Sequence, residues 1–373
     1  MTILLFACVA LGVRAQAAAK SDAVDALFSA YNQANVPGAS VIVILDGKVL
    51  YRHAYGLADV EGHVAASTAT NYRLASVTKQ FTAMAIMILA ERKQLSLDDD
   101  LTKFFPDYPA YGKQITIRHL LTHTSGLRAY EELIVTPAVL PPVSSRAGEI
   151  TGGKTAGATE RTAQLKDLDV LDLLKRQDGT YFAPGSEWRY SNTGYAHLAL
   201  IVEKASGIGF AAFLKKNIFD PLHMSGTVAF EEGISTVRNR AYGYSQRGER
   251  FERTDQSLTS AVLGDGGIYS SVEDLYRWDQ ALYTTRLVRA ESLQMAFTPA
   301  VLSGGKKTSY GFGCEIGEYR GLKAVRHGGS TMGFRTHICR IPEKRFTVIV
   351  LINRSNAKPE EIADRIADLY LFE

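Results

Sequence analysis

The sequence predicts a mixed α/β (α+β) protein in which one sheet is built from both ends of the chain. A mostly helical subdomain is inserted between the two halves of the sheet. Three observations support this prediction: an early strand hairpin, helical patterns through the middle, and four strand-like runs followed by a closing helix. Strands and helices that segregate along a chain in this way are typical of α+β proteins.

The early hairpin is predicted from SVIVILDGKVLYRHAYG at residues 40–56, which follows a helical pattern over residues 22–34. Two apolar runs are joined there by Asp46 and Gly47. Asp-Gly between such runs is a strong signal for a two-residue turn between antiparallel strands. A sheet therefore begins early in the chain.

Helical patterns dominate from about residue 76 to residue 207. They include DVLDLLKRQ and NTGYAHLALIVEKASG, and the second of these ends in a C-cap glycine. Strand patterns return in TSYGFGCEIG, GLKAVRHGG, GFRTHICRIP and KRFTVIVLIN, before an amphipathic helix from Pro359 to Leu371. We therefore predict a single domain over residues 18–373, with the helical subdomain at roughly residues 76–260.

Composition and charge indicate a globular protein with no nucleic-acid partner. Of 373 residues, 46% are hydrophobic and 22% are charged, which is ordinary for a globular domain. The 42 Lys and Arg residues nearly balance the 39 Asp and Glu residues. These charges are interspersed, without the basic stretch of a nucleic-acid reader. Nothing in the sequence fixes the oligomeric state.

The first 17 residues predict a signal peptide and a periplasmic or secreted mature protein. An apolar run from Ile3 to Val13 precedes Ala15-Gln16-Ala17, which fits the A-x-A pattern of a cleavage site. The run is too short to span a bilayer, so no stable membrane span is expected. Because no Lys or Arg precedes the run, a frayed apolar N-terminus stays open as an alternative.

Three cysteines are present, and none has a catalytic context. Cys8 would leave with the signal peptide, whereas Cys314 and Cys339 lie in strand-like segments. For these two, a buried free thiol is as consistent with the sequence as a disulfide.

The S-x-x-K pattern occurs three times, as SVTK at residues 76–79, SGGK at 303–306 and SNAK at 355–358. Only the first is followed by a helix, QFTAMAIMILAERKQL, which has almost no polar face and should be buried on nearly all sides. The second lies in a Gly-Gly turn, and the third lies where the last strand ends. Context therefore selects the first copy.

Ser76 and Lys79 are candidates for a nucleophile and its base. Residues i and i+3 of a helix are neighbours, so Lys79 can reach the Ser76 hydroxyl. Burial disfavours an ammonium ion, which is how a lysine becomes a base near neutral pH. The N-H groups of a helix N-terminus can stabilise the oxyanion formed when serine attacks a carbonyl. A helix cap followed by a lysine that reaches solvent is the alternative.

RYSNTGY supplies the chain's single Y-x-N, at Tyr190 and Asn192. A nearby ammonium stabilises a phenolate, so Tyr190 beside Lys79 could share general-base and general-acid work. Asn192 could hold Lys79 with one end of its amide and a substrate amide with the other. Alternatively, YSN is a turn with Asn192 as the cap of the helix that follows.

A third motif ends the strand-like run AVRHGGSTMG. Glycines such as Gly329 let a substrate approach the backbone, and the N-H of Ser330 is placed to be a second oxyanion donor. His327 could bind a substrate carboxylate or tune the protons of Tyr190 and Lys79. Taken alone, His-Gly-Gly also fits a plain turn.

Together these motifs resemble the family of class C β-lactamases, penicillin-binding DD-peptidases, D-aminopeptidases and related esterases. In that family S-x-x-K, Y-x-N and a K/H-[TSG]-G strand occur in this order, as SVTK, YSN and HGG do here. The resemblance spans roughly Asp22 to Phe372 and includes LLTHTSGL at 120–127 and GDGGIYSSVEDLYRWDQAL at 264–282. It implies a β-lactamase/transpeptidase-like fold, with an antiparallel sheet flanked by helices and the site between sheet and helical subdomain.

The resemblance also implies roles for these residues, without any metal or cofactor. Ser76 would be the acylated nucleophile, and Lys79 and Tyr190 the pair that transfers protons. Asn192 and His327 would position the substrate, and the N-H groups of Ser76 and Ser330 would form the oxyanion hole. Dedicated class C β-lactamases carry lysine in place of His327, and histidine there is more typical of peptidases and esterases.

Other patterns suggest different activities but lack the context those activities need. GEITGGKT, Gly148 to Thr155, fits the phosphate-loop pattern of a nucleotide-binding ATPase or kinase, but no buried strand precedes it and no helix follows. It lies in the segment Thr136 to Arg161, which we expect to be a mobile surface loop. His119 and His123 have a zinc-pair spacing without the glutamate of a metalloprotease. No G-x-S-x-G is present.

The sequence therefore predicts a serine hydrolase that acts through an acyl-enzyme on Ser76. Small esters and D-amino-acid amides or peptides are the expected substrates, with slow turnover of β-lactams. A non-catalytic relative that keeps the fold as a binding or structural protein is the alternative, because motifs do not report the geometry that catalysis needs.

Overall fold

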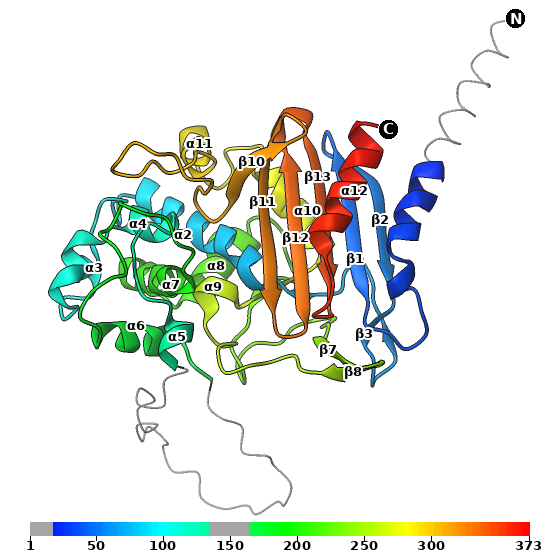
Figure 1. The fold of residues 1–373 in the computed structure, drawn as a ribbon, viewed down its shortest axis with the longest axis horizontal. Helices are drawn as coiled ribbons and strands as arrows, with labels where there is room; N and C mark the ends of the chain where they lie inside the picture. The colour runs from blue at the N-terminus through cyan, green and yellow to red at the C-terminus, as the bar shows by residue number, and fades with distance from the viewer. Residues whose placement is uncertain (1–17, 135–163) are drawn as a thin grey trace, which may run out of the picture.

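A computed structural model describes residues 18–134 and 164–373 of the chain (Figure 1). Three features predicted above lie outside the described residues. They are the signal peptide at residues 1–17, the segment from Thr136 to Arg161, and the phosphate-loop pattern that this segment contains.

The central element is a six-stranded antiparallel sheet with the strand order β10-β11-β12-β13-β1-β2. The strands are β1 (Ala39–Leu45), β2 (Lys48–Tyr55), β10 (Glu315–Tyr319), β11 (Leu322–Thr331), β12 (Phe334–Ile341) and β13 (Phe346–Ile352). The first and last of the long strands pair from Ala39 with Ile352 to Leu45 with Phe346. The prediction that the two ends of the chain complete one sheet is confirmed.

The predicted hairpin is the β1-β2 pair. Asp46 and Gly47 have φ angles of 49° and 76°, and two residues with positive φ form the tight turn that matches the twist of paired strands. Side chains then alternate along β1. Val41 and Val43 pack with one core cluster and Ile42 and Ile44 with another, so this strand is buried on both faces.

Helices cover both faces of the sheet (Figure 1). On one face lie α12 (Pro359–Leu371), as predicted, and an N-terminal helix described over residues 18–27. On the other face α10 (Val272–Ala281) contacts β1 and β13. The N-terminal helix ends at residue 27 rather than at the predicted residue 34. It ends because Phe28 turns inward to stack on Tyr55, with ring centroids 4.6 Å apart, and η1 (Ser29–Tyr31) follows.

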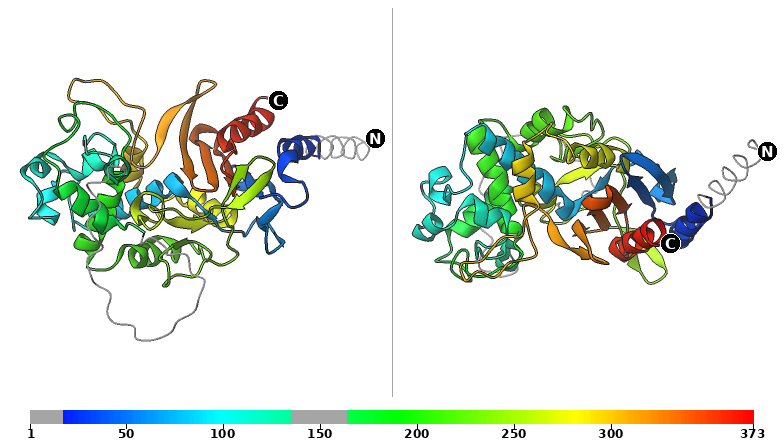
Figure 2. Two further views of the ribbon diagram at one scale, coloured as in Figure 1. Left: turned by 60° about the horizontal axis from the view of Figure 1, so that its bottom comes forward. Right: turned by 90° about the horizontal axis from the view of Figure 1, so that it is seen from above.

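A helical region lies beside the β10-β11 side of the sheet, and it keeps that position in all three ribbon views (Figures 1 and 2). Its helices and those near it are α2 (Lys79–Glu91), α3 (Leu101–Phe104), α4 (Ile117–Leu121), α5 (Tyr130–Ile134), α6 (Asp167–Lys175), α7 (Asn192–Ser206), α8 (Phe210–Leu214), α9 (Leu263–Gly266) and α11 (Ala290–Ala296). Single turns are η2 (Ala75–Thr78), η3 (Ala110–Gln114), η4 (Lys215–Phe219) and η5 (Pro342–Lys344). The predicted subdomain limits of 76 and 260 stay a prediction, and helices continue beyond the second limit to α11.

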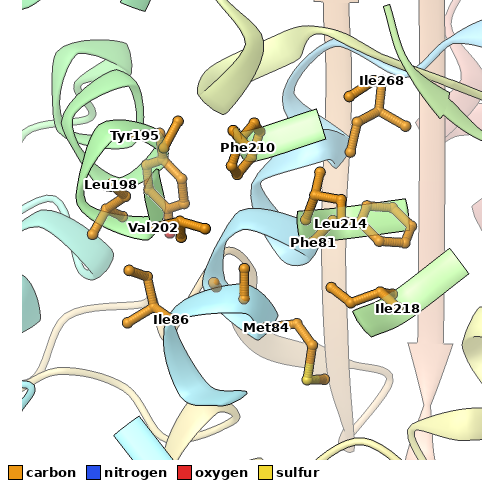
Figure 3. Packing of buried hydrophobic residues seen from close by; sticks show 14 of the residues in the cluster. Phe81, Met84, Ile86, Tyr195, Leu198, Val202, Phe210, Leu214, Ile218 and Ile268 are labelled. Atoms are coloured by element: carbon orange, nitrogen blue, oxygen red, sulfur yellow. The ribbon is translucent and has the colours of Figure 1, made fainter. Parts of the chain in front are cut away.

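Helix α2 runs through the centre of the helical region, as its sequence predicted. Every residue from Phe81 to Leu89 is buried. Its side chains meet those of α7 and α8, where Tyr195, Leu198 and Phe210 point toward it (Figure 3). Because the helix is packed all round, its first residue, Lys79, is held in the core.

Short strands were not predicted, because two to four residues are too few to show a period. They are β3 (Leu57–Asp59), β4 (Val64–Ala65), β5 (Tyr72–Arg73), β6 (Val228–Ala229), β7 (Tyr244–Arg247), β8 (Arg250–Arg253) and β9 (Ile268–Ser270). The run TSYGFGCEIG also differs from its prediction, since β10 begins only at Glu315. Gly313, at φ 70°, turns the chain so close to α2 that a Cβ there would lie 2.5 Å from the Lys79 carbonyl oxygen.

Cys314 and Cys339 are both buried free thiols, which settles the alternative that the sequence left open. Burial raises the pKa of the Cys314 thiol to about 12 and that of Cys339 to about 11, so neither is a ready nucleophile.

No single helix in the described ranges is both long and apolar enough to cross a bilayer. Asn192–Ser206 and Phe210–Phe219 reach that length and composition only together, across a bend of 74°.

Candidate active site

Ser76 lies in the single turn η2, immediately before α2, rather than in the first turn of the helix itself. Ala75 precedes it with a φ of 50°, a left-handed conformation that costs an alanine roughly 1–2 kcal/mol. Residues 71–75 and 77–79 are buried, whereas Ser76 is half-buried. The strained turn therefore carries one reachable polar side chain out of an otherwise buried segment, as is common at functional sites.

Lys79 is fully buried and its Nζ contacts three oxygen atoms. It lies 3.0 Å from Ser76 Oγ, 2.7 Å from Asn192 Oδ1 and 2.9 Å from the carbonyl oxygen of Asp265. The amide and carbonyl oxygens can only accept hydrogen bonds, so they take two N-H groups of the lysine. The third position faces Ser76, and in the neutral amine it holds the lone pair that can accept the serine proton.

A buried carboxyl group lies next to this lysine. Asp265 Oδ2 accepts a hydrogen bond of 2.9 Å from the Tyr130 hydroxyl. Burial raises the pKa of Asp265 to about 6, while the positive charge of Lys79 acts in the opposite direction. The stretch GDGG therefore supplies both a backbone acceptor and a partner charge for Lys79.

Asn192 begins α7 but its side chain does not cap that helix. Its Oδ1 accepts from Lys79, and its Nδ2 donates to Glu131 Oε1 at 2.5 Å. A carboxylate can only accept, so Glu131 fixes which end of the amide faces the lysine. One of the two N-H groups at the nitrogen end is thus taken by Glu131, and the predicted contact of this amide with a substrate stays a prediction. No sequence pattern pointed to Glu131.

We expect Glu131→Gln to lower kcat roughly tenfold, a loss of about 1.4 kcal/mol in transition-state stabilisation. A glutamine amide can either donate to Asn192 or accept from it, so it no longer fixes the orientation of Asn192 against Lys79. KM and the free energy of unfolding should change little, because the size of the side chain is kept. Glu132→Gln is the matched control on the exposed neighbour, and an equal loss of kcat there would contradict the assignment.

Tyr190 packs over the ammonium group of Lys79, whose Nζ lies 5.0 Å from the ring centroid. The ring also lies 4.2 Å from that of His123 and 6.3 Å from that of His327. The Tyr190 hydroxyl is buried and has no hydrogen-bond partner among the described residues. A buried polar group without a partner is costly, and such groups often belong to sites that bind a ligand.

His327 is held as a neutral ring on β11. Its Nδ1 lies 2.7 Å from the carbonyl oxygen of Gly328, which can only accept, so this nitrogen carries the proton. Its Nε2, 2.7 Å from the Tyr310 hydroxyl, therefore accepts a hydrogen bond. Burial lowers the pKa of His327 to about 3, and Lys79 acts in the same direction. A cationic His327 that binds a substrate carboxylate does not fit this geometry.

The neutral state of His327 predicts that stability falls in acid. An unfolded histidine has a pKa near 6.5, so between about pH 6.5 and 3 the unfolded chain binds one proton more than the folded chain. The free energy of unfolding then decreases by about 1.4 kcal/mol per pH unit as the pH falls through this window. Urea unfolding at pH 7, 6 and 5 should give a shallower dependence for His327→Gln. Equal slopes in the two proteins would show that the folded ring binds protons like an unfolded histidine and is not held neutral.

Gly329 is needed for the approach of β11 to the turn that carries Ser76. A Cβ at this position would lie 2.1 Å from the carbonyl oxygen of Leu74 and 2.2 Å from Thr336 Oγ1. Thr336 Oγ1 donates to the same carbonyl at 2.8 Å. Gly329 also lines the cleft that contains Ser76, so its predicted contact with the substrate stays a prediction.

The predicted residues meet in one cleft of about 540 Å³ at the junction of β11, η2 and α7. Ser76, Tyr190, Asn192, His327 and Ser330 all line it. A half-buried serine over a buried lysine, facing a strand that carries further N-H groups, is an arrangement suited to acyl transfer.

His119 and His123 each accept a hydrogen bond from a backbone N-H group. α4 ends at Leu121, so the two histidines do not share a helical face. Nδ1 of His119 accepts from the N-H of Thr116, and Nδ1 of His123 accepts from the N-H of Ser191 at 3.2 Å. Within residues 18–134 and 164–373 no group of three His, Cys, Asp or Glu side chains could hold a metal ion.

In the sequence His123 was identified only as part of LLTHTSGL and as one of two histidines with zinc-pair spacing. In the structure His123 packs on Tyr190 and accepts a hydrogen bond from the YSN turn. Tyr310, which fixes His327, was also missed. Neither residue has a pattern of its own, because both act through contacts between distant segments.

Three known proteins illustrate what this chain is similar to. It is 32% identical over 361 residues to Penicillin-binding protein 4* of Bacillus subtilis (strain 168), covering 93% of this chain and 75% of that protein. It is 28% identical over 329 residues to the D-aminopeptidase of Gluconobacter oxydans (strain 621H), covering 86% of this chain and only 56% of that protein. The solved structure of the octameric penicillin-binding protein homologue from Pyrococcus abyssi matches with a TM-score of 0.77 at 30% identity, covering 94% and 77% of the two chains.

The resemblance stated from the three motifs is confirmed by these matches, as is the β-lactamase/transpeptidase-like fold. The model of the Beta-lactamase family matches residues 24–371, which is nearly the whole described chain. The protein therefore belongs to the Beta-lactamase family.

Proposed function

We propose that this protein is a serine hydrolase that cleaves D-amino-acid amides or peptides and small esters through an acyl-enzyme on Ser76. The observation that carries the proposal is the contact of 3.0 Å between Ser76 Oγ and the Nζ of the fully buried Lys79. A nucleophile within hydrogen-bond reach of a base that a third group orients is the signature of covalent catalysis. Here Asn192, itself fixed by Glu131, orients the base.

In the first half of the reaction, Ser76 Oγ attacks the carbonyl carbon of the substrate and a C-O bond forms. The serine proton passes to neutral Lys79 or to the Tyr190 phenolate that a charged Lys79 would stabilise. The N-H groups of Ser76 and Ser330 hold the oxyanion. When the intermediate collapses, the C-N or C-O bond to the leaving group breaks and Tyr190 supplies its proton.

In the second half, water attacks the ester on Ser76 and gives up a proton to the same pair. The C-O bond to Ser76 then breaks and the proton returns to Ser76 Oγ. An amide and water thus become a carboxylic acid and an amine, with no co-reactant besides water. The unpartnered hydroxyl of Tyr190, in the same cleft as Ser76, supports its role in moving these protons.

The D-amino-acid preference is supported by the relatives, which include a D-aminopeptidase and a penicillin-binding protein. Because the chain spans about half the length of that D-aminopeptidase, the activity of the whole relative is transferred here only as a proposal. Neutral His327, in place of a cationic lysine, favours amides and esters over β-lactams, which bear a carboxylate.

The test is hydrolysis of matched substrates by the purified protein, with products identified by mass spectrometry. D-alanine amide, L-alanine amide, a small nitrophenyl ester and a chromogenic cephalosporin would be compared at equal concentration. We expect turnover of the D-amide and the ester, and slow or no turnover of the cephalosporin. A folded protein that turns over none of them would favour the non-catalytic alternative, a binding or structural protein of the same family.

We also propose that the mature protein is periplasmic or secreted, on the strength of the A-x-A pattern at residues 15–17. Intact mass of the protein recovered from a bacterial periplasm should correspond to a chain that begins at Ala18. A mass that includes Met1 would contradict export by cleavage at this place.

A further inference from the structure

One end of the active-site cleft is acidic. Beyond His327 its wall is formed by Glu315 at the start of β10 and by Glu360 and Glu361 at the start of α12. Lys358 is the one cation among the described residues that line the cleft. Three carboxylates thus face one ammonium in a cleft whose other end holds the proposed nucleophile.

The nearby cations do not neutralise these carboxylates. Lys358 pairs with Glu361 at 2.8 Å, but both side chains are about 70% exposed, and such pairs are weak. Arg326 lies behind the wall and is shared between Asp364 at 3.2 Å and Glu360 at 3.9 Å. With Asp364 and Arg326 included, four carboxylates face two cations, so the excess of two negative charges persists.

Glu315 has no ion-pair partner among the described residues. Burial raises the pKa of Glu315, and the charge of Glu360 raises it further, against a smaller opposing effect of Arg326. A cation bound between Glu315 and Glu360 would relieve this repulsion.

A separate observation at the same end points to a ligand. His337 on β12 is 3% exposed, and neither of its ring nitrogens has a hydrogen-bond partner among the described residues. It lines the cleft, and the residue opposite it in the β11-β12 ladder is Gly328, which has no side chain. Burial lowers the pKa of His337 to about 3, so the ring is neutral and offers one donor and one acceptor.

The order of residues along β11 indicates which part of a substrate reaches this end. Strand β10 pairs with β11 only as far as Glu315, which lies opposite Arg326. Residues 327–331 of β11 therefore have no partner in β10, and β11 contacts η2 instead. From Ser330, the proposed oxyanion donor, the strand runs back past His327, on which Tyr190 packs, toward Glu315. Since Tyr190 gives its proton to the leaving group, the acidic wall lies on the leaving-group side.

We propose that this acidic end of the cleft, formed by Glu315, Glu360, Glu361 and His337, binds a cationic group on the leaving amine of the substrate. It disfavours leaving groups that carry a carboxylate. This inference rests on the proposed function and specifies its substrate class: D-amino-acid amides whose leaving amine is positively charged, rather than peptides with a free C-terminal carboxylate beside the scissile bond.

Three amides of one D-amino acid with leaving groups of equal length test this inference. They are the 2-aminoethyl amide, which is cationic, the propyl amide, which is neutral, and the amide of β-alanine, which is anionic. We expect kcat/KM to fall in this order, with at least about a fivefold step from cation to neutral, as two partly exposed carboxylates would give. The step should shrink as salt is raised.

The decisive variant is Glu315→Gln combined with Glu360→Gln, which removes both charges and keeps the side-chain volumes. It should bring the three rates within about twofold of one another, as expected when the pair of charges is removed. Glu318→Gln on the same strand, outside the cleft, should keep the preference. His337→Phe should lower kcat/KM most for the cationic amide, because the neutral ring loses the acceptor nitrogen to which an ammonium group can donate.

Equal rates for the three amides in the native protein, or a preference that survives the double variant, would overturn the inference. If no amide is turned over, the three amides are compared as competitors of Ser76 labelling by a fluorophosphonate probe. The 2-aminoethyl amide should protect best and the amide of β-alanine least, and equal or absent protection would overturn the inference. A protein whose Ser76 is labelled without any charge preference refutes this inference alone, whereas an unlabelled Ser76 refutes the proposed function.

Discussion

Ser76→Ala should abolish hydrolysis of every substrate, with a loss of about 10⁵-fold or more in kcat, as removal of a serine nucleophile does in other hydrolases. The acyl-enzyme cannot form without the Oγ atom, and among the described residues Ser76 supplies the one hydroxyl oxygen that Lys79 Nζ contacts. Folding should be retained, since the half-buried side chain loses a single oxygen. Rates measured at saturating substrate, with circular dichroism as a check on the fold, test this.

Lys154→Ala is the matched control for that variant. Lys154 stands in the phosphate-loop pattern Gly148 to Thr155, and the proposed mechanism gives it no part. Unchanged hydrolysis in Lys154→Ala is therefore expected. Activity that survives in Ser76→Ala, or disappears in folded Lys154→Ala, would mean that the reaction is carried out elsewhere in the chain.

Tyr190→Phe should lower kcat by 10²- to 10⁴-fold, the usual contribution of a positioned acid or base. The variant is informative because the Tyr190 hydroxyl makes no hydrogen bond with any described residue. A merely structural role therefore predicts no loss of stability, or a small gain from removing an unpaired buried polar group. The expected result is a large loss of activity at unchanged stability.

Tyr195→Phe, at a tyrosine near the start of α7, is the counterpart. Its hydroxyl donates to the carbonyl oxygen of Leu121 at 2.7 Å, so removing it should cost about 1 kcal/mol of stability. Activity should be unaffected, which is the reverse of the pattern expected for Tyr190→Phe. If Tyr190→Phe keeps full activity, another group moves the protons.

Much of the fold was predictable because its signals are local. Asp46 and Gly47 fix the β1-β2 turn, and an unbroken apolar run makes α2 a core helix. The short strand β9 was not predictable, because its partners β5 and β6 come from segments far apart in the chain. The late start of β10 depends on the contact of Gly313 with α2, which sequence periodicity does not record.

The residues of the site that belong to short sequence motifs were predictable. The structure brings Ser76, Lys79 and Asn192 into contact and places Tyr190, His327 and Ser330 around the same cleft, while their roles stay predictions. The motifs do not show the protonation state or the orientation of each side chain. The neutrality of His327 depends on Tyr310, and the orientation of Asn192 depends on Glu131.

The most direct test of the central claim is the intact mass of the purified protein before and after reaction with a serine-directed fluorophosphonate, followed by peptide mapping. Ser76→Ala serves as the control. The account predicts a single adduct on Ser76 and none in the variant. A folded protein whose Ser76 stays unmodified, or an adduct that persists in Ser76→Ala, would contradict it.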